Sequence, residues 1–187
     1  SVLALWAGLI ISLIQIYFDF SAYSDMAIGM GKMLGIHYPE NFNYPYLARS
    51  VAEYWRRWHM SLGQWFRDYL YYPLALGPAI KVRKFFSKFC SRKATMVIQS
   101  AFTMAVLWFC TGLWHGASWN FVIWGALHGV YQIFGAVTLN TRKFCCEILN
   151  INRQTTHYKL FQRAITFALV TFGWIFFRSE GLTQAVV

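Results

Sequence analysis

The residues best suited to chemistry in this chain are two histidines, His59 and His115, which both lie in apolar sequence. His115 falls between two long hydrophobic runs, 94–113 and 117–139, and His59 lies among tryptophans and arginines. An ionisable side chain inside a membrane is costly, so its first interpretation is functional. Histidine is also the side chain best suited to proton transfer near neutral pH. We therefore expect these two imidazoles to carry the chemistry, the alternative being that both are packed interfacial histidines.

The other three histidines predict structural roles. His37 lies in a proline-flanked stretch and His157 in a polar connector, so we expect both at the surface. His128 follows His115 by roughly 20 Å and about 140° on one continuous helix, so the two cannot share a ligand. We expect His128 to be a packed histidine bonded to a backbone carbonyl. The four cysteines contain no CxxC motif, and we expect no metal site.

The composition is typical of an integral membrane protein. The chain is 57% hydrophobic, 20% aromatic and 13% charged, whereas a soluble domain carries about 25% charged residues. The net charge of +10 could indicate nucleic acid, but the cations cluster beside hydrophobic runs. That placement favours membrane lipid as the partner, and no nucleic acid.

Hydrophobic runs predict an all-α, multi-span membrane fold, with spans at about 2–18, 94–113, 117–139 and 164–177. A small-residue helix should follow the first span over 26–31, and Pro39 and Pro45 predict a loop or buried irregular segment over 35–46. The chain lacks an initiator Met and begins and ends in apolar sequence. We therefore expect residues 1–187 to be an internal core fragment of a larger membrane domain.

An amphipathic, aromatic-rich helix is predicted over about 48–72. On a helical wheel its aromatic side chains and His59 fall on one face, and most of its charged side chains fall on the other. Helical geometry therefore predicts that His59 points inward. The aromatic face contains Trp55, Trp58, His59, Leu62, Trp65, Phe66 and Tyr69.

Charge distribution predicts the orientation in the membrane. Basic connectors at 81–93 and 142–163 are separated by two predicted spans, so they lie on one side, and their lysines and arginines place that side in the cytoplasm. The turn that carries His115 then lies toward the outer face. His59 belongs to a segment continuous with a cytoplasmic connector, so the two histidines should meet in a tunnel across the membrane.

Several sequence blocks resemble the bacterial membrane-bound O-acyltransferases. These blocks are Tyr54-Trp55-Arg56-Arg57-Trp58-His59-Met60-Ser61-Leu62, Trp65-Phe66-Arg67-Asp68-Tyr69-Leu70-Tyr71, Gly112-Leu113-Trp114-His115-Gly116-Ala117-Ser118-Trp119-Asn120-Phe121, Trp124-Gly125-Ala126-Leu127-His128-Gly129 and Asp19-Phe20-Ser21-Ala22-Tyr23-Ser24-Asp25-Met26-Ala27. The chain is most similar to the alginate-type members and more distantly to those that transfer D-alanine to teichoic acid. The resemblance covers nearly the whole chain, although family members are larger, with more helices at both ends.

The resemblance implies an acyltransferase of the bacterial inner membrane that moves an acyl group, expected to be acetyl, onto a hydroxyl of an exported or cell-surface polysaccharide. The family's essential histidine corresponds to His115, and its second histidine to His59. No bound cofactor is implied. The donor would be an acyl thioester, acetyl-CoA or acyl carrier protein, and the partner a glycan acceptor or a periplasmic acetyltransferase.

The expected roles follow from that reaction. Neutral His115 would act as general base on the attacking hydroxyl. The oxyanion could be stabilised by His59, by the indole of Trp114 or Trp119, or by Asn120. Arg56 and Arg57 could attract the phosphates of coenzyme A or an acidic carrier protein. The alternative role for these two arginines is ordinary positive-inside anchoring.

Two other classes of protein remain open from the sequence. A polysaccharide or acyl-group transporter or channel subunit would use the same tunnel without consuming a thioester. A scaffold subunit would dock partners through the aromatic helix, so that Trp65 and Phe66 would matter and the histidines would not.

Overall fold

The described part of the chain, residues 2–179 and 181 of this computed structural model, is built from helices, which confirms the all-α prediction. A 3-10 turn occupies Pro45–Leu47 and a π-helical turn occupies Arg67–Tyr71. The α-helices in chain order are α1 (Val2–Met33), α2 (Val51–Trp55), α3 (Met60–Phe66), α4 (Tyr72–Leu76), α5 (Pro78–Phe86), α6 (Arg92–His115), α7 (Trp119–Val137), α8 (Leu139–Ile148) and α9 (Thr156–Arg178).

Three described helices are long and apolar enough to cross a membrane: Trp6–Met33 within α1, all of α6 and all of α9. The pair α7 and α8 passes the same criterion together but bends by 51° between them. The runs predicted at 94–113 and 117–139 agree with α6 and α7 to within two residues. Long apolar runs identify such helices reliably because each needs about 20 residues to cross the hydrocarbon core.

The first span extends further than the predicted 2–18. α1 continues without a break to Met33, since no proline or terminating glycine interrupts it. It ends in a left-handed glycine motif at Gly35, with φ of 75°. There the N–H of Ile36 donates to the Gly31 carbonyl at 2.8 Å and the N–H of Gly35 to the Lys32 carbonyl at 3.1 Å, which satisfies the last carbonyls.

The last span begins earlier than the predicted 164. Thr155 caps α9, its hydroxyl accepting the N–H of Tyr158 at 3.4 Å. The first two turns contain many polar side chains, so the apolar pattern alone predicts a start at about 164, whereas α9 begins at Thr156. The cap residue sets the start because it satisfies an N–H that lacks an intrahelical partner.

The continuous helix predicted over 48–72 is wrong. The chain leaves helical geometry between α2 and α3, where His59 has φ of 46° and ψ of 54°. The loop before α2 runs alongside this break and takes its backbone hydrogen bonds. The N–H of Met60 donates to the Asn41 carbonyl and the N–H of Asn43 to the Arg57 carbonyl, both at 2.9 Å. A segment 14–19 residues upstream therefore replaces the helical bonds, which periodicity within 48–72 cannot reveal.

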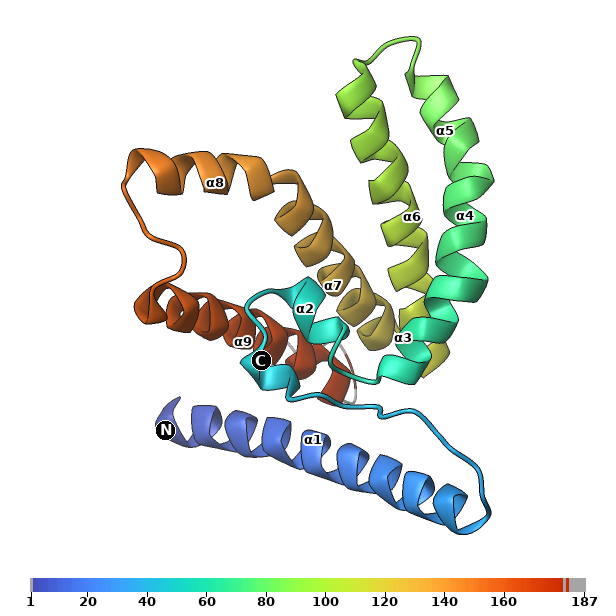
Figure 1. Cartoon of the computed structure of the whole chain (residues 1–187), viewed down its shortest axis with the longest axis vertical. Helices are drawn as coiled ribbons and strands as arrows, with labels where there is room; N and C mark the ends of the chain where they lie inside the picture. The colour runs from blue at the N-terminus through green and yellow to red at the C-terminus, as the bar shows by residue number, and fades with distance from the viewer. Residues whose placement is uncertain (1, 180, 182–187) are drawn as a thin grey trace.

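The short helix α2 packs against α7 and α9 near the middle of the molecule, whereas α3 lies nearer its edge (Figure 1). α6 and α7 form an antiparallel hairpin with the most extensive helix packing in the described chain, and α5 packs along α6. Their close approach depends on glycines: Gly125 of α7 lies against the Trp108 carbonyl and Gly112 of α6. α9 packs on α7, and α1 lies beside α9 with its long axis across one end of the molecule.

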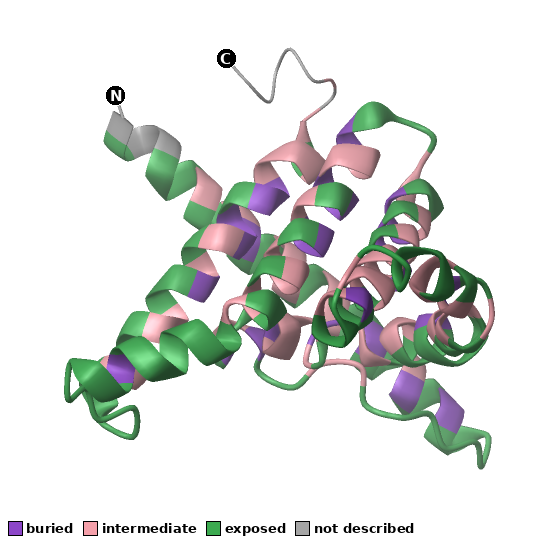
Figure 2. Ribbon diagram, turned by 90° about the horizontal axis from the view of Figure 1, so that it is seen from above, coloured by how far each residue is buried: buried purple, intermediate pink, exposed green. Residues whose placement is uncertain are grey.

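The core lies where α1, α9 and the segment 42–58 meet, and it is strongly aromatic. Its buried members are Leu13, Ala48, Tyr54, Trp58, Val170 and Trp174. The outward faces, by contrast, carry many exposed apolar side chains, especially along α1. Figure 2 shows in green all residues that are exposed, whatever their type. Such surface suits lipid or further helices and is unusual for a protein surrounded by water.

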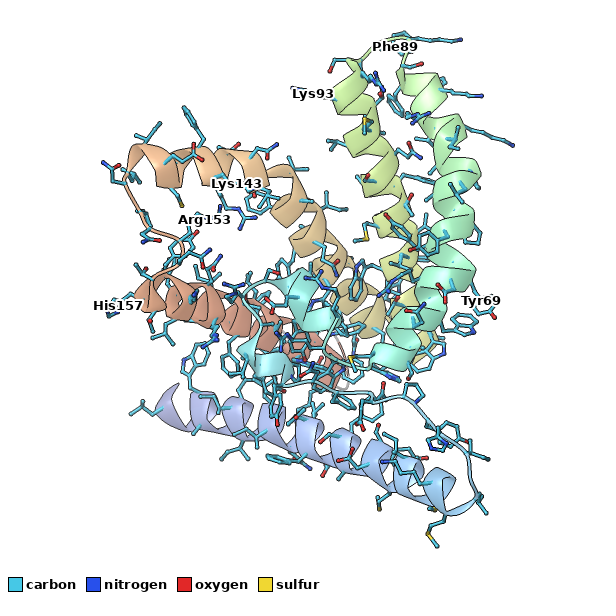
Figure 3. All side chains as sticks on the ribbon, in the orientation of Figure 1. Tyr69, Phe89, Lys93, Lys143, Arg153 and His157 are labelled. Carbon is cyan, nitrogen blue, oxygen red and sulfur yellow. The ribbon has the colours of Figure 1, made fainter. Side chains whose placement is uncertain are left out.

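The basic connectors lie at the helix ends remote from the turn at 116–118. Lys93 and the adjoining Phe89 lie at the tip of the α5–α6 hairpin, whereas Lys143 and Arg153 lie around α8 and the start of α9 (Figure 3). Lysines and arginines therefore flank the distal ends of both α6 and α7. The predicted connector at 81–93 is mostly helical, because α5 occupies Pro78–Phe86.

Candidate active site

One cavity of about 440 Å³ brings the two candidate histidines together. Its wall is formed by residues of α1, the segment 52–71, α6, α7 and α9, and both His59 and His115 line it. Most of the lining is aromatic or aliphatic, and the polar groups are few. Concave, mainly apolar spaces with a few convergent polar groups are typical of small-molecule sites.

His59 reaches the cavity from the turn between α2 and α3. The ring of Phe20 meets it edge-on, with the centroids 4.7 Å apart. Its Nδ1 lies 3.2 Å from the Asn41 Oδ1 atom. Burial lowers the pKa of His59 from 6.5 to about 4, so this imidazole is neutral at pH 7. The predicted inward orientation is confirmed, although a turn and not a helix face produces it.

His115 is the last residue of α6 and lines the same cavity. Its ring lies 5.0 Å from the rings of Trp124 and Phe177 and 4.7 Å from that of Trp114, centroid to centroid. Within the described residues its ring nitrogens have no protein hydrogen-bond partner. An imidazole held by aromatic contacts alone keeps its nitrogens available to a ligand in the cavity.

Trp114 joins the two histidines. Its ring centroid lies 6.3 Å from that of His59 and 4.7 Å from that of His115. The indole is 55% exposed and does not belong to the cavity lining. Trp114 therefore lies beside both imidazoles, where it can contact a substrate that reaches them.

Trp119 and Asn120 do not line this cavity, and the substrate-binding role expected for them stays a prediction. Trp119 is 70% exposed at the start of α7. Asn120 is buried, and its amide N–H donates to the Ser179 carbonyl at 2.6 Å, just after α9 ends. That bond ties α7 to α9 and uses the amide for packing. The position of Asn120 relative to His115 could not show this, because Ser179 lies 59 residues after Asn120 in sequence.

The two arginines differ in their surroundings. Arg57 forms a salt bridge with Glu53 at 2.8 Å and also donates to the Asn43 carbonyl, so it braces the turn before His59. Arg56 lines the cavity, as does Arg67, which the helical wheel placed on the opposite face from His59. The cations that face the cavity are therefore Arg56 and Arg67.

His128 is packed, as expected, but its partner is not a backbone carbonyl. The indole N–H of Trp55 donates to His128 Nδ1 at 3.1 Å, and the ring lies among Trp108, Trp124 and Tyr131. Its Nε2 is buried without a partner among the described residues. Since Trp55 lines the cavity, His128 fixes the orientation of one wall.

The remaining histidines are exposed, His37 in the loop after α1 and His157 at the start of α9 (labelled in Figure 3). Among the described residues, no cluster of three or more histidine, cysteine or acidic side chains could hold a metal ion.

Asn41 is one of two site residues that the sequence did not reveal, the other being Arg67. It lies in the loop that Pro39 and Pro45 predict, and its side chain contacts both His59 and Ser61. Nothing in its spacing marks it, since the contact depends on how the loop folds back over 57–61. Arg67 was missed for a related reason, because the break at His59 changes which face points inward.

Together, the helices and the cavity define a multi-helix membrane protein with two histidines in an apolar internal site. Residues 1–151 match the model of the membrane-bound O-acyltransferase family, and the chain belongs to that family.

Curated relatives support the assignment. The chain is 41% identical over 181 residues to the probable alginate O-acetylase AlgI of Pseudomonas syringae pv. tomato, covering 96% of this chain and 30% of the relative. It is 36% identical to the peptidoglycan O-acetyltransferase of Helicobacter pylori, covering 92% of this chain and 28% of the relative. It is 32% identical to the teichoic acid D-alanyltransferase of Bacillus subtilis, covering 88% and 38%. The chain thus spans about a third of the length of these relatives.

Proposed function

We propose that the protein containing this chain is a membrane O-acyltransferase that moves an acetyl group from a cytoplasmic thioester to a hydroxyl of an exported or cell-surface polysaccharide. The observation that supports this proposal best is that His59, from the turn before α3, and His115, from the end of α6, line one mainly apolar cavity. The names of the relatives, which include acetylases of alginate and peptidoglycan, favour acetyl as the group and a glycan as the acceptor.

The reaction assigned to the cavity needs a base because a sugar hydroxyl is a poor nucleophile. Neutral His115 removes the hydroxyl proton as the oxygen attacks the thioester carbonyl. The tetrahedral intermediate then collapses, the carbon–sulfur bond breaks, and the imidazolium returns its proton to the departing thiolate. No covalent acyl-enzyme is required, and the apolar wall of tryptophans excludes water that would hydrolyse the donor.

The donor's anionic part is assigned to Arg56 and Arg67. Both line the cavity, and a guanidinium can bind phosphate oxygens through two parallel hydrogen bonds. A cavity of about 440 Å³ suits the acetylated end of the donor and leaves the phosphates of acetyl-CoA or an acyl carrier protein near these cations. We assign Arg57 a structural role, because its guanidinium already binds Glu53.

We assign the site to a bacterial inner membrane, with donor access from the side of the basic connectors. The acceptor would approach from the turn that carries His115. It would be either the glycan itself or a periplasmic acetyltransferase partner that passes the acetyl group on.

The test is donor turnover by the purified natural protein in detergent or lipid, with labelled acetyl thioester. His115→Ala should lower turnover by about 10²–10⁴-fold, the usual contribution of a positioned general base. His37→Ala replaces an exposed histidine and is the matched control, so its turnover should equal that of the unmodified protein. Normal turnover in a well-expressed His115→Ala variant would reject the mechanism, and absence of thioester consumption by the unmodified protein would favour a channel.

A further inference from the structure

The side chain of Asn41 sits at the centre of a hydrogen-bond cluster behind His59. Its Oδ1 atom accepts the backbone N–H of Ser61 at 3.1 Å and the Ser61 hydroxyl at 3.0 Å. The same oxygen lies 3.2 Å from His59 Nδ1. On its other side, the Asn41 amide N–H donates to the Ser24 hydroxyl of α1 at 3.1 Å. One side chain thus connects α1, the loop and the turn that carries His59.

This cluster favours one of the two tautomers of neutral His59. The Ser61 backbone N–H can only donate, so the Asn41 atom that faces it must be the carbonyl oxygen. An amide oxygen can only accept, so the 3.2 Å contact is a hydrogen bond only when His59 Nδ1 carries the proton. In that tautomer Nε2 is the ring nitrogen that can accept a hydrogen bond.

The backbone around His59 is held just as firmly. His59 lies in the left-handed region, which costs a non-glycine residue free energy unless its surroundings stabilise it. The bonds from Met60 to the Asn41 carbonyl and from Asn43 to the Arg57 carbonyl supply that support. The ring edge packed against Phe20 completes the constraint. A strained backbone at a cavity residue is typical of functional positions.

We propose that Asn41 is a positioning residue that holds His59 as the Nδ1–H tautomer, so that His59 serves the reaction as a hydrogen-bond acceptor through Nε2. The proposal rests on the proposed acyl transfer and makes it more specific. A neutral ring in this tautomer has no N–H at Nε2 and cannot donate to an oxyanion, so one of the roles expected for His59 is removed. The partner of Nε2 is a proton-bearing group, namely a second hydroxyl of the glycan acceptor, whose hydrogen bond to His59 orients the acceptor while His115 takes the proton of the attacking hydroxyl.

Burial supports the same conclusion, because the low pKa of His59 keeps the ring neutral over the physiological range. A protonated ring would donate from both nitrogens and would lose the distinction that Asn41 imposes.

The direct test is the ¹⁵N NMR spectrum of the natural protein labelled at histidine. The signals of His59 are identified as those that are missing from the spectrum of the His59→Phe variant. The expected spectrum has an unprotonated Nε2 and a protonated Nδ1 at His59 at pH 7. A protonated Nε2 would overturn the proposal. This readout does not depend on turnover, so the tautomer can be right even where acyl transfer fails.

Kinetics of three variants give the functional test. Asn41→Leu removes the acceptor and should lower kcat by about 10–100-fold, the usual effect of deleting a histidine's orienting partner, with a smaller change in KM. Asn41→Asp keeps an oxygen beside Nδ1 and should retain more activity, with its acidic limb shifted to higher pH because the carboxylate stabilises the imidazolium. Asn43→Leu, at an exposed neighbour whose side chain has no hydrogen-bond partner among the described residues, is the matched control.

Two results would contradict the positioning role. One is an Asn41→Leu variant with the kcat and the His59 tautomer of the unmodified protein. The other is equal loss in Asn41→Asp and Asn41→Leu with an unshifted pH profile, which would indicate a structural role alone. If Asn41→Leu does not fold, the spectrum of the unmodified protein and the pH profile of Asn41→Asp decide the question.

Discussion

Gly112→Ala should open the α6–α7 hairpin at the point where it holds His115. A Cβ atom built at Gly112 lies 2.5 Å from the Phe121 carbonyl oxygen and 3.2 Å from the Val122 Cα atom. Because the obstacle is backbone, no side-chain rotation can relieve the contact. The helices must separate by roughly 0.9 Å to restore the 3.4 Å of an ordinary contact.

Gly135→Ala is the matched control, since it lies in α7 and a Cβ there meets nothing within 4 Å. Both substitutions gain about 1 kcal/mol of helix propensity, so that contribution cancels between them. The remaining difference is the overpacking cost, about 1–3 kcal/mol, by which Gly112→Ala should be the less stable variant. A displacement of this size near His115 should also lower turnover by about 10²-fold.

The assay is thermal unfolding of the natural protein in detergent together with turnover of labelled acetyl thioester. Gly135→Ala should unfold at the same temperature as the unmodified protein or slightly above it, and Gly112→Ala several degrees below. If the two variants show equal stability and equal turnover, backbone contact does not set the helix separation and the reasoning is refuted.

Three further outcomes follow from the contacts around the cavity. Asn120→Ala should destabilise the protein by about 1–3 kcal/mol, because the Ser179 carbonyl loses its buried partner, and chemical denaturation measures this. Trp55→Phe should leave both nitrogens of His128 without partners and lower stability by a similar amount, whereas a Trp65→Phe control on the exposed face should not. Lowering the pH from 6.5 to 4 should lower the melting temperature. In the unfolded chain His59 binds a proton with its ordinary pKa of 6.5, whereas in the folded protein its pKa is about 4, so protonation favours the unfolded state over this range. That slope should be shallower in His59→Phe, and an identical slope would show that His59 is not buried as described.

The fold follows from the sequence where one physical requirement dominates. The boundaries of α6 and α7 were predicted within two residues, because only a long apolar run can cross the hydrocarbon core. The predicted end of α1 and the predicted start of α9 were wrong. A glycine motif at Gly35 ends α1 and a cap at Thr155 begins α9, and both lie outside the apolar runs on which the predictions rested.

The site was predictable in part. The apolar neighbours of His59 and His115 indicated that both point inward, and both line the cavity. The break at His59 depends on hydrogen bonds with Asn41 and Asn43, which are remote in sequence. Helical periodicity therefore predicted correctly that His59 points inward, but it predicted a helix where the chain forms a turn. The partners of His128 and Asn120 lie 73 and 59 residues away, and short-range spacing carries no information about them.

The measurement that tests the joint action of the two imidazoles is a double-mutant cycle on acetyl transfer, with His59→Ala, His115→Ala and both together in the natural protein. Groups that act as a unit on one transition state give losses that do not multiply. The double variant should therefore be about as slow as the slower single variant. Losses that multiply, or full turnover in either single variant, would contradict a shared site.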